Sequence, residues 1–421
     1  MREPKLLTTL RTYDQRLFMA DLMAGVTVAM VALPLSLAIA IASGATPAQG
    51  LITAIVGGFL ISALGGSRVQ IGGPTGAFIV VVFAVIADHG YDGLVLATLM
   101  AGVILLIAGW LRAGRLIVHI PEAVINGFTI GIAVIIATSQ ISDFLGLAIE
   151  EQPADFLEKL PVLWAARDSL APQAVAIAAL TVFLIVALRR LAPRFPGLIV
   201  AVGLSSAMIV LFGLEVDTIH SRFGDLPETL PMPALPEISL ERIMRLIPSA
   251  IVIAFLAGVE SLLSAMVADR MIDGQHRPNA ELTAQGVANI GSSLFGGLPA
   301  TGAIARTATN ISAGGKTPVA GMVHALTILL FLFFAARWVG YLAMPALAAL
   351  LMITAWNMSE PHRWAGYARE RPGDVMLLAL TMLLTVFVDL TVAIGCGVAV
   401  GLIMRRFRRG AAGGDWHPPD R

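Results

Sequence analysis

The chain has 421 residues, of which 57% are hydrophobic and only 13% are charged, and its formal net charge is zero. Soluble domains carry about 25% charged residues, so the composition excludes an ordinary soluble protein, and the absence of net positive charge argues against nucleic acid as a partner. The single cysteine, Cys396, allows no intrachain disulfide and no cysteine-based metal site. We therefore expect a membrane protein whose helices pack closely through many of its 41 glycines.

The first half of the chain contains one conspicuous break in its apolar pattern. Residues 1–17 are basic and lack the features of a signal peptide, so they are predicted to be a cytoplasmic N-terminus. Residues 18–214 form a first repeat of apolar segments, interrupted at residues 72–78 by the motif GGPTGAF. The apolar run that follows, Thr75–Ala87, covers about 20 Å at 1.5 Å per residue, less than the roughly 30 Å apolar core of a bilayer. It is predicted to be a half-helix that begins at mid-membrane; the alternative is a loop followed by a short interfacial helix.

The second half repeats this feature. Residues 215–242 are polar, acidic and rich in proline, and are predicted to be an extracellular loop between the halves. Residues 243–407 form the second repeat, with a break of its own at residues 296–307, GGLPATGAIART. A short helix is expected over Thr301–Ala313, with Arg306 in its second turn. One broken helix in each half is typical of transporters built from inverted repeats, which bind their substrate at the midplane.

The charged loops predict the topology. The apolar segments number about fourteen, which we interpret as two repeats of seven. With the N-terminus inside, the loops at Arg68, Arg112 and Arg189 fall on the inner side and the acidic stretches outside, as the positive-inside rule requires. The sequence therefore predicts an all-α, multi-pass protein of the bacterial inner membrane, surrounded by lipid, with a short cytoplasmic tail at residues 408–421.

Arg306 is the strongest indication of function. An arginine inside the membrane costs at least about 2.5–3.5 kcal/mol, and a helix start adds unpaired N–H groups and about half a positive charge. Arg306 is interpreted as attracting an anion; the alternative is a structural ion pair or an arginine that reaches the membrane surface. Glu260 is its expected counterpart, pairing with it in the empty site or taking up a proton when an anion enters. Ser264 lies on the same helix face as Glu260, and the two could supply oxygens for a sodium ion.

Two other features of the sequence could indicate nucleotide binding or proton transfer. The GGKT sequence at residues 314–317 resembles the end of a phosphate-binding loop, but that motif needs a glycine at Asn310 and a preceding strand, so we reject nucleotide binding. His324, in an apolar segment, is interpreted as a packed and hydrogen-bonded residue rather than a proton relay. No nucleophile–base set or metal-ligand cluster is recognisable. We therefore expect no enzyme and no cofactor, apart from a coupling proton or sodium ion.

Several motifs together resemble the SulP anion transporters, the family of the sulfate permeases and prestin. The resemblance covers roughly residues 18–406 and implies a UraA-like fold: about fourteen segments in two intertwined inverted repeats, a core and a gate domain, and an elevator-type motion. The motifs that carry it are AGVT at 24–27, LPLSLA at 33–38, GATPAQGL at 44–51, GPT at 73–75, GVESLL at 258–263, RTA at 306–308 and GGKT at 314–317.

The resemblance also implies a site between the first segment and the two half-helices. In bicarbonate relatives a carboxylate and a hydroxyl on the eighth segment serve sodium; Glu260 and Ser264 hold those positions, and because relatives with glutamate there look proton-coupled, proton coupling is favoured. Most members carry a STAS domain after the last segment; this sequence ends fifteen residues after Arg406, so contacts made by that domain are not assumed, and a homodimer is left open. The implied anion-binding residues are Ser36, Ile39, Thr75, Gly76, Ala77, Phe78, Thr301, Gly302, Ala303, Ile304, Ala305 and Arg306.

Three functions stay open at this point. The favoured one is secondary active, proton-coupled transport of bicarbonate, sulfate or a C4-dicarboxylate. A sodium-coupled bicarbonate symporter, or an uncoupled anion channel or exchanger, is the alternative within the same chemistry. A nucleobase transporter of the same fold class is third, and Arg306 speaks against it because a neutral base offers a buried cation no partner.

Overall fold

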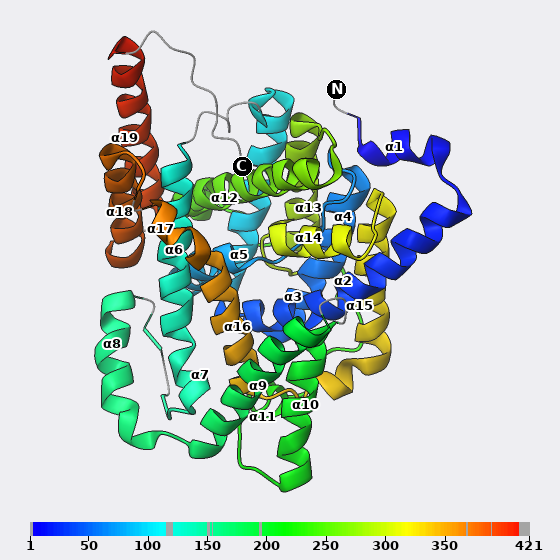
Figure 1. The fold of residues 1–421 in the computed structure, drawn as a ribbon, viewed down its shortest axis with the longest axis vertical. Helices are drawn as coiled ribbons and strands as arrows, with labels where there is room; N and C mark the ends of the chain where they lie inside the picture. Colours follow the sequence, from blue (N-terminus) through cyan, green and yellow to red (C-terminus); the bar gives the residue numbers. More distant parts are fainter. Residues whose placement is uncertain are drawn as a thin grey trace.

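The computed structural model describes residues 3–411 apart from 115–120, 150–151, 154, 193–195, 368 and 389, and it describes no side chains at 390–391 and 405–411. Helices dominate the described residues, so the prediction of an all-α protein is confirmed (Figure 1). The first half contains α1 (Lys5–Thr9), α2 (Gln15–Ala42), α3 (Pro47–Ile52), α4 (Gly58–Leu64), β1 (Gly72–Gly73), α5 (Ile79–Trp110), α6 (Glu122–Ser139), α7 (Ile141–Leu145), α8 (Phe156–Ala165), α9 (Pro172–Leu191) and α10 (Gly197–Phe212). The second contains α11 (Ile219–Phe223), α12 (Leu240–Ile272), α13 (Pro278–Leu294), β2 (Thr301–Gly302), α14 (Ile304–Ser312), α15 (Pro318–Val339), α16 (Met344–Met358), α17 (Trp364–Tyr367), α18 (Pro372–Phe387) and α19 (Leu390–Ala411).

The helices pack as two groups, each drawn from both halves of the chain. Helices α2–α5 and α12–α15 pack mainly against one another, and we call them the core group. Helices α6, α7, α9, α10, α16, α18 and α19 do the same and form the gate group. In Figure 1, α18 and α19 lie far from α2 and α15, while α2 also contacts α10 and α16 and so joins the groups. Intertwined repeats predict such mixing, although the inverted relation of the halves stays a prediction.

Length and hydropathy identify the helices that can cross a membrane. Seven are long and apolar enough among the described residues, and three shorter apolar helices accompany them. The predicted count of about fourteen segments is therefore neither reached nor contradicted by this criterion, since a half-helix is too short to meet it. The seven are Gln15–Ala42, Pro47–Leu64, Gly76–Trp110, Glu122–Leu145, Pro172–Leu191, Leu240–Ile272 and Pro318–Val339.

Helix caps shift the predicted segment boundaries by a few residues. Helix α2 begins at Gln15 because the Asp14 side chain accepts a hydrogen bond from the N–H of Leu17 at 2.8 Å. Ser239 caps α12 in the same way, so α12 begins inside the predicted loop 215–242, which also contains α11. Helix α19 continues to Ala411, past the predicted start of the tail at residue 408. Residues 1–2 and 412–421 of the two predicted termini lie outside the described residues.

Candidate functional site

The two breaks in the apolar pattern lie side by side. Strand β1 pairs antiparallel with β2, placing Gly72 opposite Gly302 and Gly73 opposite Thr301. The N–H of Ala303 extends the contact by donating to the carbonyl of Ile71 at 2.8 Å. Each strand leads directly into a helix start, so the prediction that the two starts lie close together is confirmed.

Both short helices begin later than the sequence predicts. Residues Thr301 and Gly302 are extended, because they pair with β1, so α14 starts at Ile304 and Arg306 lies in its first turn rather than its second. Gly76–Phe78 form a 3₁₀ turn, and the α-helix follows at Ile79. That helix joins the next segment through a sharp bend at Gly90, whose φ of 71° and ψ of 175° favour glycine.

Arg306 is buried and has no acidic partner among the residues that the structure describes. Its side chain is 1% exposed, and Nη2 donates to the hydroxyl of Ser36 on α2 at 3.2 Å. Neither Nε nor Nη1 has a hydrogen-bond partner among the described residues. Arginine stays protonated in proteins, and a buried charge without a partner is costly. The guanidinium therefore offers free donors and a full positive charge beside the start of α14.

The predicted pairing of Glu260 with Arg306 is wrong for this conformation. The Oε2 atom of Glu260 accepts a hydrogen bond from the Thr75 hydroxyl at 2.7 Å instead. Thr75 is extended at the end of the first break, which lets its hydroxyl reach α12. Glu260 is thus attached to the first break, whereas Arg306 reaches from the second break to α2. The positive charge of Arg306 is consequently not cancelled by a carboxylate contact.

One face of α12 contacts both breaks. The Thr301 hydroxyl donates to the carbonyl of Ala257 at 2.8 Å, and the hydroxyls of Ser264 and Thr307 are hydrogen-bonded at 3.2 Å. Ala257, Glu260 and Ser264 lie at successive turns of α12, and residues three or four apart share a helix face. The predicted coupling residues therefore lie against the strand pair, with Ser264 fully buried.

The remaining predicted site residues fall into three sets. Ile39, Ala77 and Phe78 are buried in one large apolar cluster, to which both helix groups contribute. Gly76, Thr301, Gly302 and Ala303 are also buried, at the breaks themselves. Ile304 and Ala305 are exposed, in contrast to their neighbour Arg306. The exposed first turn of α14 gives one edge of the site access to its surroundings.

Glycines allow the arginine to lie against the strand pair. A Cβ atom on Gly73 would lie 2.5 Å from Nη1 of Arg306, so any side chain there would displace the guanidinium. A Cβ on Gly302 would lie 1.5 Å from Nε2 of Gln70. Gly73 and Gly302, one from each break, are thus favoured by close approach as well as by helix termination.

A polar face of α13, not recognised from the sequence, supports the second break. The side chain of Asn289 donates to the carbonyl of Ala300 at 2.8 Å and accepts from its N–H at 2.9 Å. Three residues beyond, the Ser292 hydroxyl donates to the carbonyl of Leu298 at 2.6 Å. Polar residues at 281, 285, 289 and 292 recur at helical spacing, a signal that was available in the sequence.

Glu281 starts this polar face and is fully buried. Its Oε2 accepts from the N–H groups of Gly66 at 2.8 Å and Ser67 at 3.2 Å. Its Oε1 accepts from the hydroxyl of Ser261 at 2.9 Å and from Nε2 of Gln285 at 3.1 Å. Four donors satisfy a buried carboxylate, so Glu281 holds the loop between α4 and β1 against α12 and α13.

The GGKT sequence has a structural partner inside the chain. The carboxylate of Asp21 on α2 accepts from the N–H groups of Lys316 at 2.8 Å and Thr317 at 3.1 Å, and from the Thr317 hydroxyl. The N–H groups that would face a phosphate are therefore used to join α2 to the start of α15. His324, further along α15, is fully buried, as expected for a packed residue, although neither ring nitrogen has a hydrogen-bond partner of ordinary geometry among the described residues.

Comparison of the sequence with known proteins identifies the family of the chain. The model of the sulfate permease family matches residues 18–381. The chain is 42% identical to "Putative sulfate transporter YvdB" of Bacillus subtilis over 393 residues, which cover 93% of this chain and 73% of that protein. It is 33% identical to the bicarbonate transporter BicA of Picosynechococcus, with 91% of this chain and 69% of that protein covered.

Solved structures agree with the fold. The transmembrane domain of a cyanobacterial bicarbonate transporter BicA superposes with a TM-score of 0.79 at 30% identity, covering 93% of this chain and 98% of that one. The murine Slc26a9 anion transporter in the inward-facing state gives a TM-score of 0.84 at 17% identity, covering 96% and 71%. The second likeness concerns the fold alone.

Proposed function

The chain belongs to the sulfate permease family, whose members are transporters rather than enzymes, and we propose that it carries a small anion across the membrane by secondary active transport. The observation that carries this proposal is Arg306. In the described part of the chain this buried guanidinium has two nitrogens without a hydrogen-bond partner and no acidic partner, so it needs negative charge close by. An oxyanion at the start of α14 would meet both the arginine and the free N–H groups of the helix.

The substrate is proposed to be bicarbonate, sulfate or a C4-dicarboxylate. Relatives named as sulfate and bicarbonate transporters cover most of this chain. All three anions present oxygens that accept charge-assisted hydrogen bonds from a guanidinium. Ser36, which already holds Nη2, would fix the orientation of the fork while Nη1 and Nε meet the anion.

Proton coupling is assigned to Glu260. Its carboxylate is bound by Thr75 on the first break, while the anion would bind at the second, and the two breaks are paired strand to strand. A proton on Glu260 would remove the repulsion between two nearby negative charges, so proton and anion would favour each other's binding. In the sodium-coupled alternative, Glu260 and Ser264 would supply oxygens to the cation.

The two helix groups suggest the transport motion. The strand pair and Arg306 belong entirely to the core group, and α2 borders the gate helices α10 and α16. We propose that the core group carries the anion past the gate group in an elevator-type movement. The expected setting is a bacterial inner membrane with both termini in the cytoplasm, and a homodimer is the proposed assembly.

Uptake into proteoliposomes tests the proposal. Bicarbonate, sulfate and a C4-dicarboxylate would be offered separately, each with and without an imposed proton or sodium gradient. We expect one of these anions to accumulate against its gradient when the outside is acidic, and accumulation to be lost in Arg306→Ala. Accumulation driven by sodium alone would select the symporter alternative, and flux that only dissipates gradients would select a channel.

A further inference from the structure

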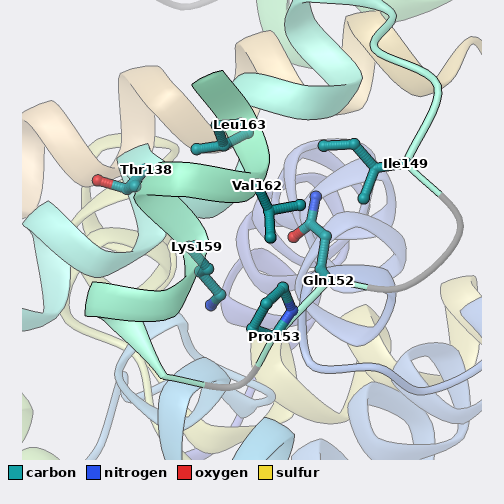
Figure 2. A pocket seen from close by; sticks show the side chains of 7 residues that line it. All are labelled: Thr138, Ile149, Gln152, Pro153, Lys159, Val162 and Leu163. Atoms are coloured by element: carbon teal, nitrogen blue, oxygen red, sulfur yellow. The ribbon is translucent and has the colours of Figure 1, made fainter. Parts of the chain in front are cut away.

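A lysine is buried on α8 although the acidic residues Asp155 and Glu158 lie close to it in the sequence. Lys159 on α8 is only 5% exposed, and its Nζ lies 5.0 Å from the ring centroid of Phe83 on α5. No carboxylate forms an ion pair with it in the part of the chain that the structure describes. Figure 2 shows Lys159 beside Gln152 and Pro153 in a narrow pocket between α6 and α8.

Helix α8 contacts both helix groups through one face. Phe156 packs edge to face against Phe387 of the gate helix α18, with ring centroids 5.7 Å apart. Lys159, three residues on, lies over Phe83 of the core group, and residues at this spacing share a helix face. The chain also joins α8 to the gate helices α7 and α9. A movement between the groups would therefore break the Lys159–Phe83 contact, along with the contacts that α2 makes with α10 and α16.

Phe83 lies on the first short helix, beyond the candidate site. Phe78 is at the beginning of that helix, and residues 87–90 at its other end are exposed. Phe83 is also close to the turn at Gly44, where an added Cβ would be 3.4 Å from the ring. Phe83, with Lys159 over its ring, thus lies along this helix between the candidate site and the exposed end, which is predicted to face the extracellular side.

Burial of the ammonium has an electrostatic cost that the ring offsets in part. Loss of hydration lowers the pKa of Lys159, and the charge of Asp155, one turn earlier, opposes this shift. A cation over an aromatic face gains attraction from the ring, more so when water is excluded. Once Phe83 moves away, the ammonium would regain water or meet an anion.

We propose that Lys159 is the outer gate residue of the transport route, closed on Phe83 in this conformation and turned toward the incoming anion when the core group moves. This inference rests on the proposed anion transport. Lys159 would act on one side of the membrane only: it would lower the KM for anion on the outer side and leave the KM for anion on the inner side unchanged.

The test is to measure the KM for transport separately with anion offered on the outer side and on the inner side of the membrane. Lys159→Met keeps the length and apolar contact of the side chain but removes the charge, and Lys159→Arg keeps the charge. We expect Lys159→Met to raise the KM for external anion roughly tenfold, the lower end of what a local charge does to ligand capture, with Lys159→Arg close to wild type. Arg167→Met is the matched control, because Arg167 also lies over an aromatic ring, Trp164, but is exposed. An unchanged external KM, or an equal rise from both sides, would overturn the proposal.

Chemical rescue keeps the test independent of folding. Lys159→Cys in a Cys396→Ala background would be treated with 2-bromoethylamine, which rebuilds a lysine-like ammonium. External KM should return toward wild type, and treatment with a neutral alkylating reagent of similar size should not restore it. Equal rescue by both reagents would contradict a role for the charge. A wild-type protein that moves no anion would instead remove the proposed function itself, so the two failures are distinguishable.

Discussion

The Nη2 atom of Arg306 donates to the hydroxyl of Ser36 at 3.2 Å, which joins the first turn of α14 to the C-terminal part of α2. No carboxylate takes part in this contact. Glu260, the acidic residue expected to neutralise the arginine, is held 2.7 Å from the Thr75 hydroxyl on the other break. The site therefore presents a positive charge anchored by a neutral group, an arrangement suited to binding an anion.

Gly73 should not tolerate a side chain. A methyl group there would lie 2.5 Å from Nη1 of Arg306, so Gly73→Ala must push the guanidinium away from β1. We expect at least a tenfold loss of anion affinity, on the order of 1.4 kcal/mol, and some loss of stability as well, because the φ of 149° at Gly73 is one that side chains rarely adopt. Gly203→Ala on α10 is the control, since a Cβ there would meet nothing within 4 Å. Binding measured by isothermal titration should separate the two variants; equal affinities would show that the guanidinium is not positioned against Gly73.

Glu260→Gln should uncouple transport from protons. Glutamine keeps an oxygen to accept the Thr75 hydrogen bond but cannot exchange a proton, so folding and anion exchange should persist. Accumulation driven by a pH gradient should disappear, while exchange of labelled for unlabelled anion across the membrane continues. If the variant still concentrates anion under an imposed pH gradient, the proton does not travel on Glu260.

Asp21→Asn should destabilise the core group without touching the site. The amide nitrogen of asparagine would replace one of the two accepting oxygens. In one orientation it would face the N–H groups of Lys316 and Thr317, and in the other it could no longer accept from the Thr317 hydroxyl, so buried donors would stay unpaired either way. Each such group costs about 1–3 kcal/mol, so thermal unfolding in detergent should occur several degrees lower. The control Asp168→Asn, at an exposed position, should change the unfolding temperature little. Equal unfolding temperatures would indicate that the GGKT contact is dispensable.

The glycine breaks and Arg306 could be found from the sequence because each violates a local rule: glycine and proline interrupt an apolar helix, and a charge appears within it. The later start of α14 could not, since it depends on pairing between strands more than two hundred residues apart. The partner of Glu260 was missed for the same reason, as spacing along α12 does not reveal where the Thr75 hydroxyl points. Lys159 was hidden by the acidic residues around it, and its burial comes from Phe83, in another part of the chain.

The central claim is that Arg306 binds the anion rather than offsetting Glu260. Arg306→Ala should weaken binding about 10- to 100-fold, as expected for loss of charged hydrogen bonds of about 1.5–3 kcal/mol. Arg306→Lys should recover only part of the lost affinity, because lysine keeps the positive charge but lacks the planar fork of the guanidinium.

The decisive measurement is the affinity of one transported anion, by isothermal titration on purified protein, for Arg306→Ala, Glu260→Gln and the double variant. The structure shows no contact between the two side chains, so we predict that the double variant binds as weakly as Arg306→Ala alone. Recovery of near-wild-type affinity in the double variant would contradict this account, since it would mean that the arginine serves only to balance the carboxylate.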